Sequence, residues 1–136
     1  MDGPTQRPLE LILARNLLST LSTPAFLANQ PGDIVFYNEA AGAVLGRRFE
    51  EQGAMSADDW VQAFGPIDEA GNPIPVEEQP LTAALRRNRP GHSRHRIRSL
   101  AGGNEYEVEV SGVPVIGGDG FVGAMVFFWV ADEGHA

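Results

Sequence analysis

Residues 93–110 read SRHRIRSLAGGNEYEVEV and contain two runs of strict alternation separated by a pair of glycines. The first run alternates Arg94, Arg96 and Arg98 with His95, Ile97 and Ser99, and the second alternates Glu105, Glu107 and Glu109 with Tyr106, Val108 and Val110. Successive side chains of a strand point to opposite faces of a sheet. The stretch therefore predicts an antiparallel hairpin with a charged outer face and a mostly apolar inner face.

The glycine pair Gly102-Gly103 suits a two-residue turn that needs positive φ angles. With that turn, the expected cross-strand pairs are Arg98 with Glu107, Arg96 with Glu109, Ile97 with Val108 and His95 with Val110. A slip of one residue would turn three arginines into the core, so we expect the assignment of faces to be fixed.

The flanking sequence supplies the rest of an α+β domain. Residues 25–28 and 34–37 form a first hairpin around Pro31-Gly32, and further strands are expected near 92–100, 104–116 and 121–131. Helices are expected from Glu39 to Leu45 after an Asn38 cap, from Ser56 to 64, and from 76 or 77 to 89. This order predicts one antiparallel sheet with helices on one side.

Two rows of apolar residues run along a predicted helix at 9–22, which follows a loose tail at 1–8. One row is Leu11, Ala14, Leu18 and Leu21, and the other is Leu9, Leu13 and Leu17. An apolar face this wide is larger than one shallow contact would bury. We expect the helix to pack partly on its own sheet and partly on a second copy, and the candidate dimer contacts are Leu9, Leu11, Leu13, Leu17, Leu18 and Leu21.

Composition excludes several functions. The 136 residues carry a net charge of −8 and include no cysteine, and all ten basic residues are arginines. An acidic chain repels phosphate backbones, so nucleic-acid binding is not expected. Missing lysine removes Walker-type phosphate loops and Schiff-base chemistry, and missing cysteine removes disulfides and thiolate ligands. No apolar stretch is long enough to span a bilayer and no basic signal peptide is present, so we expect a cytoplasmic protein.

Three motifs resemble the PAS family. Residues 38–46, NEAAGAVLG, look like its Asn-x-Ala-x4-Leu-Gly pattern, and residues 68–75, DEAGNPIP, resemble the run into its long helix. Gly103, Ser111, Pro114, Gly120, Val122, Gly123, Ala124 and Asp132 look like its last two strands. The resemblance covers residues 23–132, followed by a tail at 133–136. It implies a five-stranded antiparallel sheet in the order 2-1-5-4-3, with helices on one face enclosing a small cavity.

The resemblance also implies a sensory or signalling module that binds a small molecule or a protein partner, forms homodimers and has no catalytic residues. The candidate cavity residues are Phe26, Phe36, Leu45, Trp60, Phe64, Leu85, His95, Ile97, Val108, Val110 and Phe127. We expect no resident cofactor and leave the identity of any small molecule open. No pair of histidines has helical metal-ligand spacing with a carboxylate, so no metal site is expected.

Three alternatives stay open. A haem sensor would need an axial imidazole, for which His95 and His92 are candidates. Flavin photoreceptors of the family need a cysteine in a run like Gly-Arg-Asn-Cys-Arg-Phe, where this chain has Gly46-Arg47-Arg48-Phe49, so only non-covalent flavin remains. A small cone-shaped isomerase or hydrolase-like enzyme would use His95 as its base. The literal G-x-G-x-x-G at 118–123 precedes strand-like residues and is interpreted as a turn.

Overall fold

The computed structural model describes residues 9–68, 70–75, 78–87, 89–99, 105–117 and 120–131, and all their side chains except those of residues 85, 87 and 121. Both expected tails and the Gly102-Gly103 turn lie outside this part of the chain. The helices are α1 (Leu9–Ser19), α2 (Glu39–Leu45), α3 (Phe49–Gln52), α4 (Ala57–Phe64) and α5 (Pro80–Arg87). The strands are β1 (Ala25–Asn29), β2 (Ile34–Tyr37), β3 (Gly91–Arg98), β4 (Glu105–Gly117) and β5 (Gly120–Val130).

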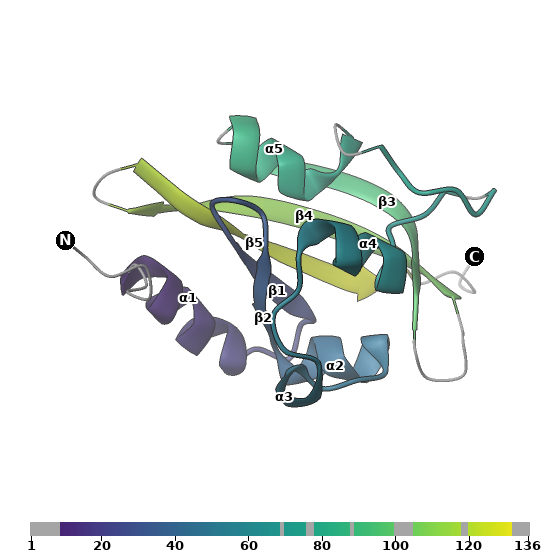
Figure 1. The fold of residues 1–136 in the computed structure, drawn as a ribbon, viewed down its shortest axis with the longest axis horizontal. Coiled ribbons are helices and arrows are strands. Elements are labelled where there is room, and N and C mark those ends of the chain that lie inside the picture. The colour runs from purple at the N-terminus through teal and green to yellow at the C-terminus, as the bar shows by residue number, and fades with distance from the viewer. Residues whose placement is uncertain are drawn as a thin grey trace.

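The five strands form one antiparallel sheet in the order β2-β1-β5-β4-β3 (Figure 1). This confirms the α+β class and the predicted strand order. The N-terminal strand β1 lies between β2 and the C-terminal strand β5, so the two ends of the domain meet at the centre of the sheet. The glycine-rich stretch before β5 leads into a strand and not a helix, as expected.

The β3–β4 hairpin has the predicted faces but a different register. Arg96 lies opposite Glu107 and Ile97 opposite Tyr106, so each β3 residue pairs two positions away from the expected β4 partner. A shift of two residues keeps every side chain on its face, and the alternating pattern therefore cannot distinguish the two registers. Arg98 with Glu105 is the pair nearest the expected turn, and the turn itself lies outside the described residues.

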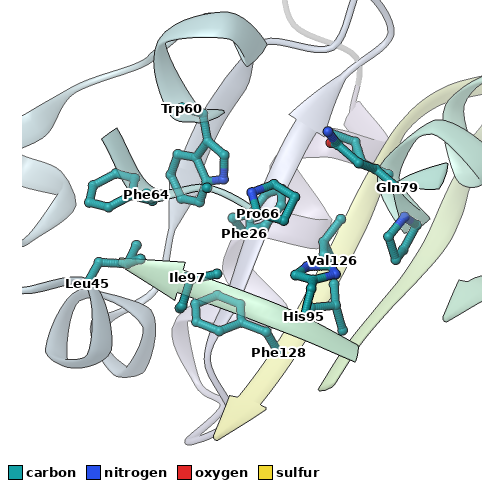
Figure 2. A pocket seen from close by; sticks show the side chains of 14 residues that line it. Phe26, Leu45, Trp60, Phe64, Pro66, Gln79, His95, Ile97, Val126 and Phe128 are labelled. Carbon is teal, nitrogen blue, oxygen red and sulfur yellow. The ribbon is translucent and has the colours of Figure 1, made fainter. Parts of the chain in front are cut away.

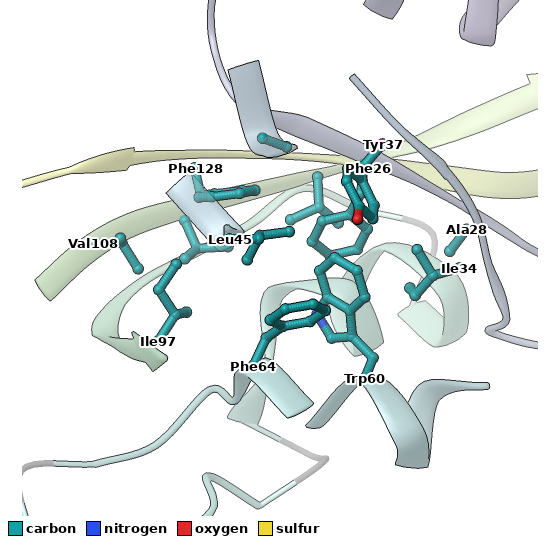
Figure 3. Packing of buried hydrophobic residues seen from close by; sticks show 13 residues of the cluster. Phe26, Ala28, Ile34, Tyr37, Leu45, Trp60, Phe64, Ile97, Val108 and Phe128 are labelled. Atoms are coloured by element: carbon teal, nitrogen blue, oxygen red, sulfur yellow. The ribbon is translucent and has the colours of Figure 1, made fainter. Parts of the chain in front are cut away.

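Helices α2, α4 and α5 pack on one face of the sheet, which we call the inner face (Figures 1 and 3). Its core contains Phe26, Ala28, Ile34, Tyr37, Ala41, Leu45, Trp60, Phe64, Ile97, Val108, Val110, Val126 and Phe128. The local signals for α2 and α4 are confirmed. Asn38 accepts a hydrogen bond from the backbone of Ala41, Gly46 ends α2 at φ 86°, and Ser56 accepts from Asp59. These caps satisfy backbone groups that the helix ends leave unpaired.

The third expected helix is shorter than predicted. It begins at Pro80 and ends at Arg87, whereas the sequence suggested residues 76 or 77 to 89. Proline is favoured at the first position of a helix, because its fixed φ suits the helix and its missing N–H would be unpaired there anyway. Pro80 is therefore a start signal that the analysis of apolar spacing overlooked.

Helix α1 lies across the opposite, outer face of the sheet (Figure 1). A second core forms there from Leu11, Ala14, Leu18, Ala25, Leu27 and Phe36, with Met125 and Phe127 packed against it. The expectation that Phe36 and Phe127 line the inner cavity was therefore wrong. The helix itself ends at Ser19, three residues earlier than expected, in a tightened turn where Thr20 and Leu21 donate to the carbonyls three residues before them.

Candidate ligand cavity

A cavity of about 50 Å³ lies between the inner face of the sheet and the helices (Figure 2). Its wall is formed by Phe26, Leu45, Trp60, Phe64, Gly65, Pro66, Gln79, Pro80, Leu81, His95, Ile97, Val110, Val126 and Phe128. Strands β1, β3, β4 and β5 supply the floor, while α2, α4, the connector after α4 and the start of α5 supply the sides. The described part of the wall is almost entirely apolar, and none of the described lining residues is an arginine, aspartate or glutamate.

Aromatic rings form one side of the cavity (Figure 3). The ring centroid of Trp60 lies 4.8 Å from that of Phe26 and 4.8 Å from that of Phe64, with the planes tilted by 48° and 62°. Phe128 continues the row at 6.4 Å from Phe26. Tilted pairs at these distances are the favourable arrangement for aromatic quadrupoles. The rings thus hold one another in place and give the cavity a rigid wall.

Among the described lining residues, Gln79 and His95 carry polar side chains, in addition to the indole N–H of Trp60. The amide nitrogen of Gln79 donates to the carbonyl of Ile74 at 3.1 Å, which fixes that side chain against the connector. His95 is 9% exposed, and its Nδ1 lies 3.0 Å from the hydroxyl oxygen of Ser93. Burial lowers the pKa of His95 to about 4, because the imidazolium form would lose its hydration. The ring is therefore neutral at pH 7.

Close backbone contacts hold the connector after α4 and the start of α5 over the cavity. A Cβ on Gly112 would lie 2.8 Å from the carbonyl oxygen of Pro80, so glycine lets the start of α5 approach β4. Ile67 exchanges two backbone hydrogen bonds with Arg96, at 2.9 and 3.0 Å, along the outer edge of β3. Pro66 and Gln79 are thereby held over the sheet by segments anchored on either side.

Most of the predicted cavity residues lie on this wall, namely Phe26, Leu45, Trp60, Phe64, His95, Ile97 and Val110. Val108 belongs to the same core but does not line the cavity. Phe36 and Phe127 lie on the outer face, and the side chain of Leu85 is outside the described part of the chain. Sequence reasoning missed Gly65, Pro66, Gln79, Pro80, Leu81, Val126 and Phe128. For Leu81 a signal existed, because it belongs to the apolar stripe of α5.

The cavity does not fit haem or flavin. One water-sized group needs about 10–15 Å³, so the space holds roughly four such groups, far fewer than either ring system contains. His92, the second haem candidate, lies away from the cavity, with its Nε2 3.2 Å from a carboxylate oxygen of Glu109 and its ring 6.2 Å from that of Trp129. The thiol needed for flavin adduct chemistry is absent from the sequence.

The described residues of this wall are poorly suited to acid–base catalysis. A general base needs a pKa near the working pH and a partner that orients it. Burial lowers the pKa of His95 to about 4, and among the described side chains the Ser93 hydroxyl is its hydrogen-bond partner. Within the described residues, no three His, Asp or Glu side chains gather as a metal would require. None of the described helices is long and apolar enough to cross a bilayer.

The dimer candidates on α1 fall into two groups. Leu11 and Leu18 are buried against the outer face of their own sheet, and Leu21 packs on its rim. Leu9, Leu13 and Leu17 are 62%, 56% and 50% exposed. Ile12, which the sequence analysis did not single out, is 43% exposed on the same side of the helix. We call Leu9, Ile12, Leu13 and Leu17 the exposed row.

No family model and no curated protein matches the sequence at a significant level. Solved structures do match. The PAS domain of a protein from Colwellia psychrerythraea is 16% identical with a TM-score of 0.63, and the match covers 90% of this chain and 98% of that one. A PAS domain from a two-component sensor histidine kinase is 16% identical with a TM-score of 0.53, covering 90% and 97%.

A third match is an RNA-binding Light-Oxygen-Voltage receptor, 15% identical with a TM-score of 0.65. Here the match covers 96% of this chain but 36% of the receptor. Each of the three matches covers at least 90% of this chain, with TM-scores from 0.53 to 0.65. The chain has the PAS fold.

Proposed function

We propose that this chain is a signalling module that takes a small ligand in its inner cavity and acts through a homodimer formed by α1. Catalysis has no part in the proposal. The fold supports it, since one of the matched domains comes from a sensor kinase and another from a light receptor. A protein partner in place of the second copy would use the same surface.

The exposed row on α1 is the observation that carries the proposal. The helix buries Leu11, Ala14 and Leu18 on its own sheet, and these contacts already hold it on the domain. Leu9, Ile12, Leu13 and Leu17 contribute little to that contact and remain exposed. Four large apolar side chains on one helix side are typical of an interaction surface.

The size of the exposed row suits a weak, concentration-dependent dimer. Full burial of one such side chain contributes about 1.5–3 kcal/mol. Eight half-exposed side chains from two copies would contribute roughly 8 kcal/mol, against an association cost of about 4–15 kcal/mol. The two numbers are of similar size, so modest changes in the position of α1 would change the dimer population.

Strand β5 offers a direct route between cavity and helix. Val126 and Phe128 face the cavity, while Met125 and Phe127, their neighbours in the chain, pack against the outer core, to which α1 contributes. Asn38 adds a second link, because its amide nitrogen donates to the carbonyl of Leu18 at 3.0 Å while its oxygen caps α2. A ligand that prefers one arrangement of these elements would shift the population of dimers.

Sedimentation of the full chain tests the dimer. We expect the wild-type chain to sediment as a concentration-dependent dimer and Leu13→Gln/Leu17→Gln to sediment as a monomer with unchanged circular dichroism. Val130→Gln is the matched control, since Val130 is 46% exposed at the far end of β5. A monomeric wild-type chain, or a double variant that dimerises as well as the wild type, would refute the role of α1.

A further inference from the structure

The chemistry of the cavity wall defines the class of ligand, and this inference rests on the proposed function. We propose that the cavity takes an uncharged molecule of small-ring or short-chain size that carries one polar group, and that this group hydrogen-bonds to Nε2 of His95. The wall residues, the size of the cavity and the surroundings of His95 each support one part of the proposal (Figure 2).

The absence of countercharge on the wall excludes ions. None of the described residues that line the cavity is an arginine, aspartate or glutamate, and the lining histidine is neutral at pH 7. An anion would leave water without meeting a cation, and a cation would meet no carboxylate, so either would lose its hydration uncompensated. The aromatic faces do not replace a carboxylate, because Phe26, Trp60 and Phe64 pack against one another.

The imidazole of His95 offers one free hydrogen-bonding atom. Nδ1 is engaged by the Ser93 hydroxyl at 3.0 Å, and no other side chain of the described residues bonds to the ring. A serine hydroxyl can rotate to donate or to accept. When it donates to Nδ1, Nε2 carries the proton and can meet a carbonyl or ether oxygen. When it accepts from Nδ1, Nε2 is an acceptor and can meet a ligand hydroxyl.

The cavity size limits the ligand. About 50 Å³ admits roughly four water-sized groups without movement. Pro66, Gln79 and Leu81 line the cavity from the connector and from α5. A ring of five or six atoms requires these three residues to yield slightly. Because they lie on the connector and on α5, occupation of the cavity would move the elements that cover the inner face.

Two tryptophans make the test direct. The chain contains two, and their positions differ: Trp60 lines the cavity, whereas Trp129 lies on β5 beside His92 and is 39% exposed. The two indole N–H resonances in a nitrogen-correlated NMR spectrum therefore report separately on the cavity and on a remote surface. Trp129→Phe assigns them.

The probes are phenol, toluene, benzoate and benzylammonium, titrated into the full chain at pH 7. We expect phenol and toluene to shift the Trp60 resonance saturably and to leave that of Trp129 in place, while benzoate and benzylammonium shift neither. Phenol should bind about 2- to 10-fold more tightly than toluene, the difference that one neutral hydrogen bond makes. The same titration should shift the imidazole Nε2 resonance of His95 with phenol and not with toluene.

Variants of two histidines on β3 isolate the contact. His95→Leu should remove the preference for phenol over toluene, whereas His92→Leu should retain it, since His92 lies outside the cavity. Should His95→Leu fail to fold, the Nε2 shift in the wild-type chain decides the same point. Equal affinities for phenol and toluene in the wild-type chain would refute the hydrogen bond.

The outcomes separate the ligand class from the proposed function. Tighter binding of benzoate or benzylammonium at Trp60 would overturn the uncharged ligand while leaving a ligand-binding cavity in place. If no probe shifts Trp60, the cavity is not a binding site, and both the ligand class and the ligand part of the proposed function fail. The sedimentation result would stand independently in either case.

Discussion

The inner face of the sheet is covered by α2, α4 and α5 from the middle of the chain, whereas the outer face is covered by the N-terminal helix α1. The inner core interlocks aromatic rings from β1, α4 and β5 and leaves a cavity. The outer core is mainly aliphatic, and its buried members come from α1, β1 and β2. The two faces of the sheet therefore have different roles. The inner face forms the floor of a cavity, and the outer face binds a helix whose other side is exposed.

The two faces also differ along the sheet. At β1 and β5 both faces are apolar, so that Phe26 and Leu27 are both buried although they point in opposite directions. At β3 and β4 the outer face is charged, with the side chains of Arg94 and Glu107 joined at 3.0 Å. Helix α1 therefore has apolar surface to cover only on the central strands and the adjoining end of β4.

The assignment of neighbouring β5 residues to opposite faces gives the largest expected effect. Phe128 is 3% exposed in the inner core, whereas Phe127 is partly buried against the outer core. We expect Phe128→Ala to lower the free energy of unfolding by about 3–5 kcal/mol, the usual cost of truncating a buried phenylalanine. Phe127→Ala should lower it by about half as much, since the side chain is only partly buried. Urea unfolding followed by circular dichroism measures both.

Near-equal losses for the two variants would mean that the faces are equally packed, and a larger loss for Phe127→Ala would reverse their assignment. Fluorescence of Trp60 sharpens the result. Because Phe128 belongs to the row of rings that includes Trp60, Phe128→Ala should change the emission of the folded protein and Phe127→Ala should not.

Asn38 connects the two faces and carries the next largest effect. It is 2% exposed, accepts from the backbone N–H of Ala25 and Ala41, and donates to the carbonyls of Leu18 and Thr23 at 3.0 and 2.9 Å. In Asn38→Asp an oxygen replaces the donating nitrogen and faces those two carbonyls. We expect a loss of about 2–4 kcal/mol, because two buried acceptors lose their donor and a buried charge is added.

Hydrogen exchange distinguishes this effect from general destabilisation. The backbone amides at the end of α1 should exchange faster in Asn38→Asp than in Phe128→Ala at matched global stability, since Asn38 holds that end of the helix. Asn29→Asp is the control, because Asn29 is less buried and uses its oxygen to accept from Asp33 at 2.9 Å. Equal exchange at Leu18 in the two destabilised variants would show that Asn38 does not tie α1 to the sheet.

Charge decided which parts of the fold could be predicted. On β3 and β4, alternating Arg and Glu mark the outer face, and the inner positions of His95, Ile97 and Val110 followed from the sequence. On β2 and β5 both faces are apolar, so the sequence does not show which side chains point to which face. Phe36 and Phe127 were therefore assigned to the wrong face. The register of the β3–β4 hairpin was missed because a shift of two residues preserves every face.

The rest of the cavity wall could not be predicted from periodicity. Gly65, Pro66 and Gln79 lie on irregular segments, where no repeat of two or 3.6 residues indicates direction. Their positions depend on contacts between distant parts of the chain, such as Ile67 with Arg96 and Pro80 with Gly112. Asn38 was recognised as a helix cap, but its bonds to Leu18 at the end of α1 and to Thr23 connect residues 20 and 15 positions apart and leave no local signal.

The pH dependence of stability gives the smallest expected effect and tests whether His95 faces the inner core. Its pKa is about 4 in the folded protein, lowered by burial, and 6.5 is its ordinary value. Between these values the unfolded chain binds a proton that the folded protein does not. The contribution of the neutral, buried His95 to the unfolding free energy is therefore fully present above pH 6.5, and it declines as the pH falls toward 4. Above pH 7.5 neither state binds the proton and the contribution is flat.

Comparison with His95→Leu isolates this contribution, since the two proteins share every other titratable group. From pH 7.5 to 5.5 we expect the wild-type chain to lose about 1 kcal/mol more unfolding free energy than the variant. This value allows for solvent screening of the partly accessible ring. Parallel curves for the wild type and His95→Leu would mean that the imidazole keeps its hydration when the chain folds, and the inner face would then offer a ligand a wet surface at that position and not a dry wall.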